Sequence, residues 1–284
     1  GEESLVVADV LPKERAIEAS AYLSHSWNVS ERFFMDYGLR YSLFNTNGKR
    51  YHYPEIRVSG RVMITDNISF KAGFNSLTQY IHMLSNTTTM SPTDIWKLSD
   101  KDIKPQEGWQ AAGGFYTNLF QNKVEVSVEG YYKQMENYLD YKSGAVLVMN
   151  RNLAADVVQT QGKAYGVEFM LKKPLGKLNG WLAYTWSKTQ LREVGDRGNM
   201  AINGGKWYDA AYDKPHDLKL VANYKFTQRI SLSVNGDYAT GRPITIPVAK
   251  YQYDGATKLY YSERNSHRIP DYFSIVLALI FAPS

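Results

Sequence analysis

The sequence contains no cysteine, and this absence excludes three kinds of chemistry. Without thiols the chain cannot form a disulfide framework, a thiolate zinc site or a cysteine nucleophile. Histidine is scarce as well, with five residues, and no pair of them has the His-Glu-x-x-His spacing of a helical zinc site. The sequence therefore predicts no metal site, no cofactor and no catalytic residues.

Long apolar runs are also missing. The longest largely apolar stretch covers about residues 272–282, which is shorter than the roughly 20 residues that a membrane-spanning helix needs. The mean hydropathy of the chain is −0.41. These values exclude a helical membrane protein. They leave a membrane β-barrel open, because strands that alternate between apolar and polar residues average to a polar score.

Charge of one sign is not concentrated anywhere. The chain has 33 Lys and Arg against 28 Asp and Glu, and these residues are spread along its length without a basic stripe. We therefore expect no nucleic-acid partner. Residues 1–4 offer neither a cationic start nor an apolar segment, so no signal peptide is predicted at this start. Either the protein stays in the cytoplasm or its gene begins upstream of this point.

The dominant pattern in the chain is an alternation of apolar and polar residues with a period of two. It predicts strands with one apolar and one polar face. The expected strands cover residues 14–26, 32–43, 55–65, 68–80, 108–119, 123–139, 156–172, 180–190, 217–226, 230–240 and 269–282. Strands of soluble proteins usually have about 5 or 6 residues, whereas a tilted membrane strand needs about 9 to 11. The lengths therefore favour a transmembrane barrel.

The connections between these segments alternate between short and long. Short ones occur after the first, third, fifth, seventh and ninth segments, and the long ones are expected at 44–54, 81–107, 140–155, 191–216 and 241–268. Outer-membrane barrels show the same alternation, with short periplasmic turns and long extracellular loops. Aromatic residues gather at the strand ends, as in the girdles of such barrels. They include Phe33, Phe34, Tyr80, Trp109, Tyr131, Tyr132, Trp181, Trp186, Tyr272 and Phe273.

The number of expected strands is odd, whereas bacterial single-chain barrels usually have an even number. The alternation of loops would put residue 1 outside the cell and residue 284 in the periplasm. We therefore expect an incomplete barrel, with further strands before and after this chain. The last segment also differs from the others, because Val276, Ala278 and Ile280 make its second face apolar as well.

Ten stretches in a characteristic order resemble the C-terminal part of the barrel of TonB-dependent outer-membrane receptors. They read YGLRYS (37–42), FKAGF (70–74), PTDIW (92–96), IKPQ (103–106), EGYYK (129–133), YGVE (165–168), WLAYTWSK (181–188), YDKPHD (212–217), YATGRP (238–243) and RIPDY (268–272). The resemblance implies an all-β, antiparallel, up-and-down transmembrane barrel of 22 strands around an N-terminal plug. Residues 1–284 would form one partial barrel domain of about 11 strands.

The same resemblance implies a function without catalysis. A receptor of this kind imports a scarce ligand, such as an iron chelate, cobalamin or a glycan, across the outer membrane of a Gram-negative bacterium. Its expected partners are outer-membrane lipid, the TonB complex acting through the plug, the ligand itself and, for a glycan, a surface lipoprotein. After Tyr272 the sequence departs from the family pattern, which continues the alternation and ends on an aromatic strand.

Two long loops carry the candidate ligand contacts, because loops on a rigid scaffold often carry binding residues. Loop 81–107 offers His82 and Trp96, and loop 241–268 offers Tyr251, Tyr253, Tyr260 and Tyr261. Tyrosine rings can stack on sugar rings or on a flat chelate. A second set of residues, with charges at alternate strand positions, is expected to point into the lumen. There it would serve solubility and plug packing or, as the alternative, ligand selectivity. This set comprises Glu125, Glu129, Lys133, Glu168 and Lys172.

Two other classes of function stay open from the sequence. Asp213, His216 and Asp217 lie close in the chain and suggest an outer-membrane β-barrel enzyme, although their position after a long loop is explained more simply by the start of a strand. A soluble β-rich binding fragment is the other alternative. Long strands with one apolar face argue against it, since that face would be an aggregation hazard in water.

Overall fold

The structure is a computed structural model that describes residues 14–46, 48–85, 94–142 and 152–283. Within these ranges the chain consists mainly of β-strands, with three short 3₁₀ helices near the ends of strands. No helix in the described part of the chain is long and apolar enough to cross a membrane.

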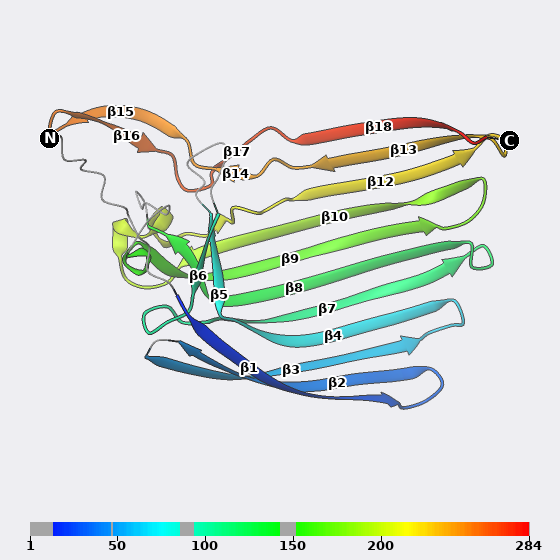
Figure 1. Ribbon diagram of the computed structural model, residues 1–284, viewed down its shortest axis with the longest axis horizontal. Coiled ribbons are helices and arrows are strands. Elements are labelled where there is room, and N and C mark those ends of the chain that lie inside the picture. Colours follow the sequence, from blue (N-terminus) through cyan, green and yellow to red (C-terminus); the bar gives the residue numbers. More distant parts are fainter. Residues whose placement is uncertain (1–13, 47, 86–93, 143–151, 284) are drawn as a thin grey trace, which may run out of the picture.

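Eleven long antiparallel strands lie side by side in one sheet (Figure 1). In spatial order they are β1 (Ala16–Asn28), β2 (Phe33–Thr46), β3 (Lys49–Met63), β4 (Ile68–Gln79), β7 (Gln106–Leu119), β8 (Val124–Tyr141), β9 (Val157–Lys173), β10 (Leu178–Glu193), β12 (His216–Lys225), β13 (Ile230–Ala239) and β18 (Tyr272–Phe281). Spatial order follows chain order throughout, which is an up-and-down topology. The eleven strands expected from the alternation are confirmed.

Smaller elements occupy the connections at one end of the sheet, which we call the loop end (Figure 1). They are β5 (Ile81–Ser85), β6 (Asp94–Leu98), β11 (Tyr208–Asp209), β14 (Pro243–Ile244), β15 (Pro247–Tyr253), β16 (Ala256–Tyr261), β17 (His267–Arg268) and the 3₁₀ helices η1 (Leu153–Ala155), η2 (Gly198–Met200) and η3 (Ile202–Gly205). β5 pairs with β6, β14 with β17 and β15 with β16, while β11 adds to the end of β10.

The opposite end of the sheet carries only tight turns. Each of its five connections has four residues, at 29–32, 64–67, 120–123, 174–177 and 226–229. Side chains hold several of them, as where the Thr65 and Thr227 hydroxyls accept backbone N–H groups at the starts of β4 and β13. Phe120, Gln121 and Asn122 all have positive φ angles, which permits the sharp reversal between β7 and β8.

One expected loop is absent. Residues 44–54 were expected to form a long connection, but β2 and β3 extend through them and pair up to Thr46 and Lys49. The chain therefore reverses between Thr46 and Lys49, where Gly48 has a φ of +83°. Glycine adopts a positive φ at little cost, which suits the tight turn of a two-residue hairpin. Four of the five connections at the loop end are long, and this one is short.

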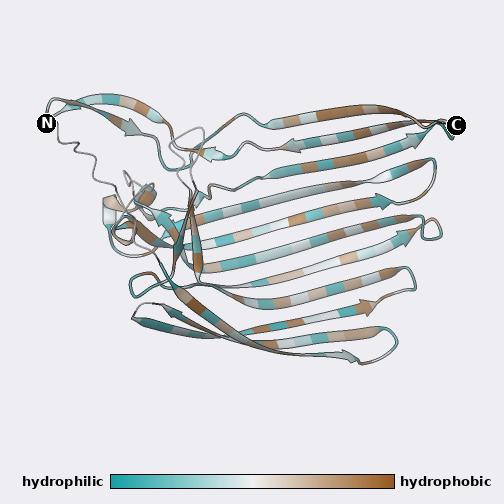
Figure 2. Ribbon diagram, in the orientation of Figure 1, coloured by the Kyte–Doolittle hydropathy of each residue, from teal (hydrophilic) through white to brown (hydrophobic). Residues whose placement is uncertain are grey.

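The sheet has a polar and an apolar face, which appear as alternating bands along most strands, whereas β18 is apolar on both faces (Figure 2). Directly paired residues share a face. One such row joins Lys71, Gly114, Glu129 and Glu168 across β4, β7, β8 and β9. We call the face with this row the inner face. The charged residues expected in the lumen all lie on the inner face. Glu125 and Lys133 are each four residues along β8 from Glu129 and so share its face, and Lys172 pairs with Glu125.

A continuous row of aromatic rings crosses the outer face near the loop end. Phe74, Trp109, Tyr132, Tyr165 and Trp186, one from each of five neighbouring strands, follow one another with ring centroids 5.5 to 6.3 Å apart. We call this row the aromatic belt. Amphipathic rings at one level of a membrane-facing surface are typical of the headgroup region.

Candidate functional site

The hairpin β5–β6 lies across the loop end of the inner face, and its first anchor is aromatic (Figure 1). Tyr80, just before β5, stacks on Phe44 of β2 with centroids 4.5 Å apart and planes 3° from parallel. Its hydroxyl hydrogen-bonds the Ser42 hydroxyl at 2.6 Å. Tyr51 joins the same buried cluster from β3. The inward alternation of β2 and β3 supplies these residues, which hold one side of the hairpin.

The second anchor of the hairpin is aliphatic. Leu84 of β5 and Ile103, which follows β6, are almost fully buried in a cluster with Leu139, Tyr141 and Val157. This cluster joins the hairpin to the loop ends of β8 and β9. The hairpin therefore spans the inner face from β2–β3 to β8–β9, and we call it the cross-hairpin.

His82 lies inside the cross-hairpin. Its side chain is 3% exposed, and its Nε2 is 2.9 Å from the Ser99 hydroxyl. Burial and the nearby Lys97 ammonium lower the pKa of His82 to about 4, so the ring is neutral at physiological pH. His82 is therefore a buried structural residue of the cross-hairpin.

Lys97 is the centre of an ion-pair group at the base of the hairpin. Its ammonium binds the carboxylates of Glu14 and of Asp100, the latter at 2.9 Å. Burial alone would raise the pKa of Asp100, but the bonds from Lys97 and from the backbone N–H groups of Asp102 and Ile103 outweigh it and lower that pKa. This group links the cross-hairpin to the chain just before β1.

A buried polar network joins the other loops to the end of β8. The Arg264 guanidinium donates to the Tyr141 carbonyl at 2.6 Å, lies 3.4 Å from the Asp140 carboxylate and stacks on the Tyr141 ring. Tyr208 donates a short hydrogen bond to Asp140. Burial and the adjacent carboxylate of Asp140 raise the pKa of Tyr208, so its hydroxyl stays protonated and acts as a donor. Loops 191–216 and 241–268 are thereby attached to one strand.

Arg268 forms the second junction between those loops. Its guanidinium binds the carboxylates of Asp209 and Asp213 and donates to the backbone carbonyls of Asp213 and Gly241. The Asp213 side chain is 1% exposed and also accepts the backbone N–H of Thr189 at 2.7 Å. A buried carboxylate with a cationic partner and a backbone donor is fully satisfied, which accounts for its burial.

The three residues that suggested an enzyme do not form a catalytic group. Asp213 is occupied by Arg268, as described above. The Nδ1 of His216 hydrogen-bonds the Tyr184 hydroxyl at 2.7 Å on the outer face. Asp217 pairs with Thr185 and therefore points to the inner face. The simpler interpretation, a strand start, is confirmed, and nowhere in the described ranges do three or more His, Asp or Glu side chains gather as a metal site would require.

The aromatic candidates in the loops lie at the surface. Trp96 is 63% exposed on β6, and the hairpin β15–β16 exposes its four tyrosines by 40 to 68%. The register of that hairpin places Tyr251, Tyr253 and Tyr260 on one face, together with Lys258. No ring contact joins Trp96 to these tyrosines in the parts of the chain described here. The structure therefore offers two separate aromatic surfaces, and His82 belongs to neither.

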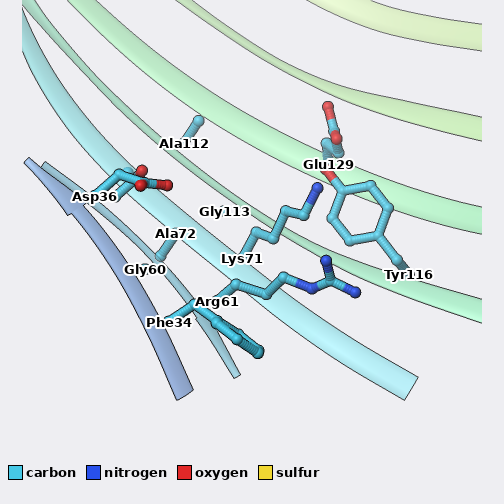
Figure 3. A pocket seen from close by; sticks show the side chains of 12 residues that line it. Phe34, Asp36, Gly60, Arg61, Lys71, Ala72, Ala112, Gly113, Tyr116 and Glu129 are labelled. Atoms are coloured by element: carbon cyan, nitrogen blue, oxygen red, sulfur yellow. The ribbon is translucent and has the colours of Figure 1, made fainter. Parts of the chain in front are cut away.

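The inner face carries a polar hollow that the sequence reading did not identify. A pocket of about 490 Å³ is lined by Asp36, Arg61, Lys71, Tyr116 and Glu129, with glycine and alanine at its floor (Figure 3). The Lys71 ammonium lies 4.7 Å from the centre of the Tyr116 ring. The signal was available, since these residues occupy the polar positions of β2, β3, β4, β7 and β8.

Comparison with known proteins identifies the architecture. A family model described as the TonB-dependent receptor-like β-barrel matches residues 9–277. The chain belongs to this family. It is thus part of a transmembrane, antiparallel up-and-down β-barrel, as the resemblance of its motifs implied, and the family consists of transport receptors rather than enzymes. No curated protein matches the sequence.

Solved structures of the family support the fold. The FrpB iron transporter of Neisseria meningitidis is 14% identical with a TM-score of 0.61, and the alignment covers 95% of this chain and 39% of that one. The ferripyoverdine receptor of the outer membrane of Pseudomonas aeruginosa is 13% identical, with a TM-score of 0.59 and coverages of 93% and 32%. The ferric-catecholate import receptor Fiu of Escherichia coli is 12% identical, with a TM-score of 0.57 and coverages of 93% and 44%. The chain thus spans 32 to 44% of the length of these receptors.

Proposed function

We propose that residues 1–284 are one partial barrel domain of an outer-membrane receptor that binds a scarce ligand and imports it. The observation that carries this proposal is the combination of a mainly polar inner face and an apolar outer face on the ten strands from β1 to β13 of the sheet, with the large connections at one end. A wall of this kind separates lipid from a polar lumen, and its loops form a vestibule on one side.

The proposed cargo is an iron chelate, with cobalamin or a glycan as the other classes. Three similar structures are described as an iron transporter, a ferripyoverdine receptor and a ferric-catecholate import receptor, which favours the first class. In this proposal the protein lies in the outer membrane of a Gram-negative bacterium, and the TonB complex supplies energy through a plug that fills the polar lumen. A surface lipoprotein would join it if the ligand is a glycan.

Uptake by cells tests the proposal directly. The gene that encodes this chain is deleted, and the uptake of radiolabelled ferric siderophores, cobalamin and oligosaccharides is compared with that of the parent strain. We expect loss of uptake of one ferric chelate, and restoration by the gene on a plasmid. A parent strain and a deletion strain that take up every probe equally would contradict the proposal, as would recovery of the protein outside the outer-membrane fraction.

Ligand contacts are proposed at Trp96 and at the exposed tyrosines Tyr251, Tyr253, Tyr260 and Tyr261. Their rings are free to stack on a flat chelate or a sugar. His82 can take part only if the cross-hairpin opens, because its ring is buried against Ser99. Replacing Tyr251, Tyr253 and Tyr260 together by alanine should weaken binding of the transported ligand at least tenfold, whereas an unchanged Kd would remove this hairpin from the site.

A further inference from the structure

Three cations follow one another on the outer face, directly beyond the aromatic belt. Lys188 of β10 pairs with Tyr165 of β9, which belongs to the aromatic belt. Two residues further along β10, Gln190 pairs with Lys163 of β9. Arg192 comes after another two residues and pairs with Gln161. Residues two apart on one strand share a face, so all three side chains point outward from β9 and β10. Diagonal neighbours of this kind lie about 7 to 8 Å apart.

An indole ring from a loop gathers two of these cations. Trp207 precedes β11. The Lys163 ammonium lies 4.2 Å and the Arg192 guanidinium 4.8 Å from the centroid of its ring. Two cations against one indole repel each other, and the ring quadrupole offsets this only in part. A group that carries negative charge between them would stabilise the arrangement.

The neighbouring groups leave this charge uncompensated. Arg192 donates to the neutral amide oxygen of Gln161 at 2.6 Å, and the amide nitrogen of Gln161 donates to Glu136 at 2.9 Å. Glu136 is therefore engaged by an amide, and in the described ranges no salt bridge reaches Lys163, Lys188 or Arg192. Asp209, which pairs with Gln190 on the same face, is engaged by Arg268. The three cations and the carboxylate of Glu136 therefore leave this surface with a net charge of +2.

The level of the surface in the membrane indicates what it meets. Lys163 and Lys188 lie two residues from Tyr165 and Trp186 of the belt, which is about 7 Å along a strand. If the belt marks the headgroup level, the cations begin where lipid phosphates lie. Clusters of Lys and Arg near a membrane surface attract anionic lipid headgroups.

We infer that Lys163, Lys188, Arg192 and Trp207 form a binding site for the phosphate of an anionic lipid headgroup on the loop side of the membrane. The inference rests on the proposed function, since it takes the outer face to be the lipid-facing one. The site is separate from the loops and from the inner face, and it would fix the depth and tilt of β9 and β10 in the bilayer.

Lipid binding by charge variants tests the site. The receptor is produced with the sequence that flanks this chain in its gene, extracted from the outer membrane in detergent, and titrated with bisphosphorylated lipid A and with its dephosphorylated form. The double variant Lys163→Gln with Arg192→Gln should bind the bisphosphorylated lipid roughly 30-fold more weakly, because each cation near a membrane surface contributes roughly fivefold. Dephosphorylated lipid A should bind the wild type about as weakly as the bisphosphorylated form binds the double variant.

A matched control removes the same charge from the inner face. Lys133 lies at the same level of the barrel, since Lys133 pairs with Ala164 and the next residue, Gln134, pairs with Lys163. The control variant is Lys133→Gln with Arg61→Gln, and its affinity for lipid A should stay within twofold of the wild type. Equal affinity of the outer-face variant and the wild type for bisphosphorylated lipid A would overturn the inference.

Inorganic phosphate distinguishes a lipid from a soluble anion. Displacement of lipid A by phosphate at equal concentration would assign the site to a soluble anion and overturn the lipid assignment. Fractionation and uptake, measured on the same strains, separate the two proposals. A protein absent from the outer membrane defeats both, whereas normal location and uptake with lipid binding insensitive to the charges defeats only this one.

Discussion

At the scale of single residues, two tyrosine rings of the inner face each cover a glycine on the adjacent strand. A Cβ added to Gly38 would lie 2.8 Å from the Tyr22 hydroxyl, and one added to Gly166 would lie 2.9 Å from the Tyr131 ring. Glycine in a strand offers no side chain to pack, and an aromatic ring over it replaces the missing contact. The glycines therefore provide room for rings that keep the inner wall closely packed.

Gly166 provides a test of this packing. Its added Cβ would also meet the Trp186 carbonyl oxygen at 2.6 Å, and backbone atoms cannot move aside as a flexible side chain can. Gly166→Ala should lower the free energy of unfolding by about 1 to 3 kcal/mol, measured by urea denaturation of the lipid-reconstituted receptor. Gly130→Ala is the control, because the nearest atom to its added Cβ is 3.8 Å away. Equal stability of the two variants would contradict this account.

The burial of His82 predicts a pH-dependent opening of the cross-hairpin. The pKa of about 4 in the folded hairpin lies below the ordinary value of 6.5, so the opened state binds a proton more readily between these two values. The stability of the hairpin should therefore be unaffected above pH 6.5 and should fall by roughly 3 kcal/mol as the pH decreases to 4. Asp100, whose pKa is lowered, stays ionised over most of this window and Lys97 stays protonated.

Hydrogen exchange of β5 at pH 7 and pH 4.5, corrected for the intrinsic rate, measures this opening. Exchange should accelerate at the lower pH in the wild type. A His82→Asn variant lacks the titrating group, so its corrected exchange should not change with pH in this range. An equal response in both proteins would assign the opening to other groups.

His82 also shows where sequence reasoning stops at this scale. A histidine in a long loop beside a tryptophan was expected at the ligand surface, and the tryptophan is indeed exposed. The histidine is buried because β5 pairs with β6 and brings Ser99 to its ring. That contact joins residues 17 apart through a hairpin whose strands have only five residues each, too short for an alternation pattern to be read reliably.

At the scale of elements, the alternation located all eleven long strands and missed those in the loops. The long strands are found easily because a face of about five or more apolar residues repeats with a strict period of two. The hairpin β15–β16 has exposed residues on both faces and so lacks the apolar–polar contrast. The strand ends beside Gly48 were missed because their outward positions, Asn45 and Arg50, are polar and interrupt the apolar–polar alternation.

The two faces of β8 allow a direct test of which side meets lipid. Val128 points outward and is 41% exposed, while its neighbour Ser127 points to the inner face. Val128→Lys should lower stability by about 2 to 4 kcal/mol, the cost of a cation on the lipid face near mid-membrane. Ser127→Lys places the same charge in the polar lumen and should cost less than about 1 kcal/mol. Urea unfolding in lipid vesicles measures both, and the reverse order would mean that the faces are assigned wrongly.

At the scale of the whole molecule, the described sheet is open at both sides. β1 pairs only with β2, and β18 pairs only with β13 among the described residues. β1 is exposed along all of its 13 residues. Unpaired strand edges with apolar side chains are sites of association between chains. This openness agrees with the expectation of an incomplete barrel, which the odd number of strands had indicated.

The chain expressed alone should therefore associate through its edges. We expect residues 1–284 in plain buffer to form large oligomers, visible by light scattering after size-exclusion chromatography. Leu23→Lys with Leu277→Lys introduces a charge on each edge strand and should reduce the oligomer size. A monodisperse monomer of the unmodified chain in buffer would contradict the prediction and favour a soluble binding domain.

The four-residue turns at one end of the sheet have a consequence for how such a receptor can diversify. Insertions there would disturb turns whose geometry depends on hydrogen bonds such as that of Thr65 and on positive φ angles such as that of Asn122. The connections at the other end hold whole hairpins and tolerate changes in length, because their backbones are attached to the wall at only a few junctions such as Arg268. Variation over evolutionary time is thereby directed to the surface that meets the environment, while the wall in the membrane stays the same.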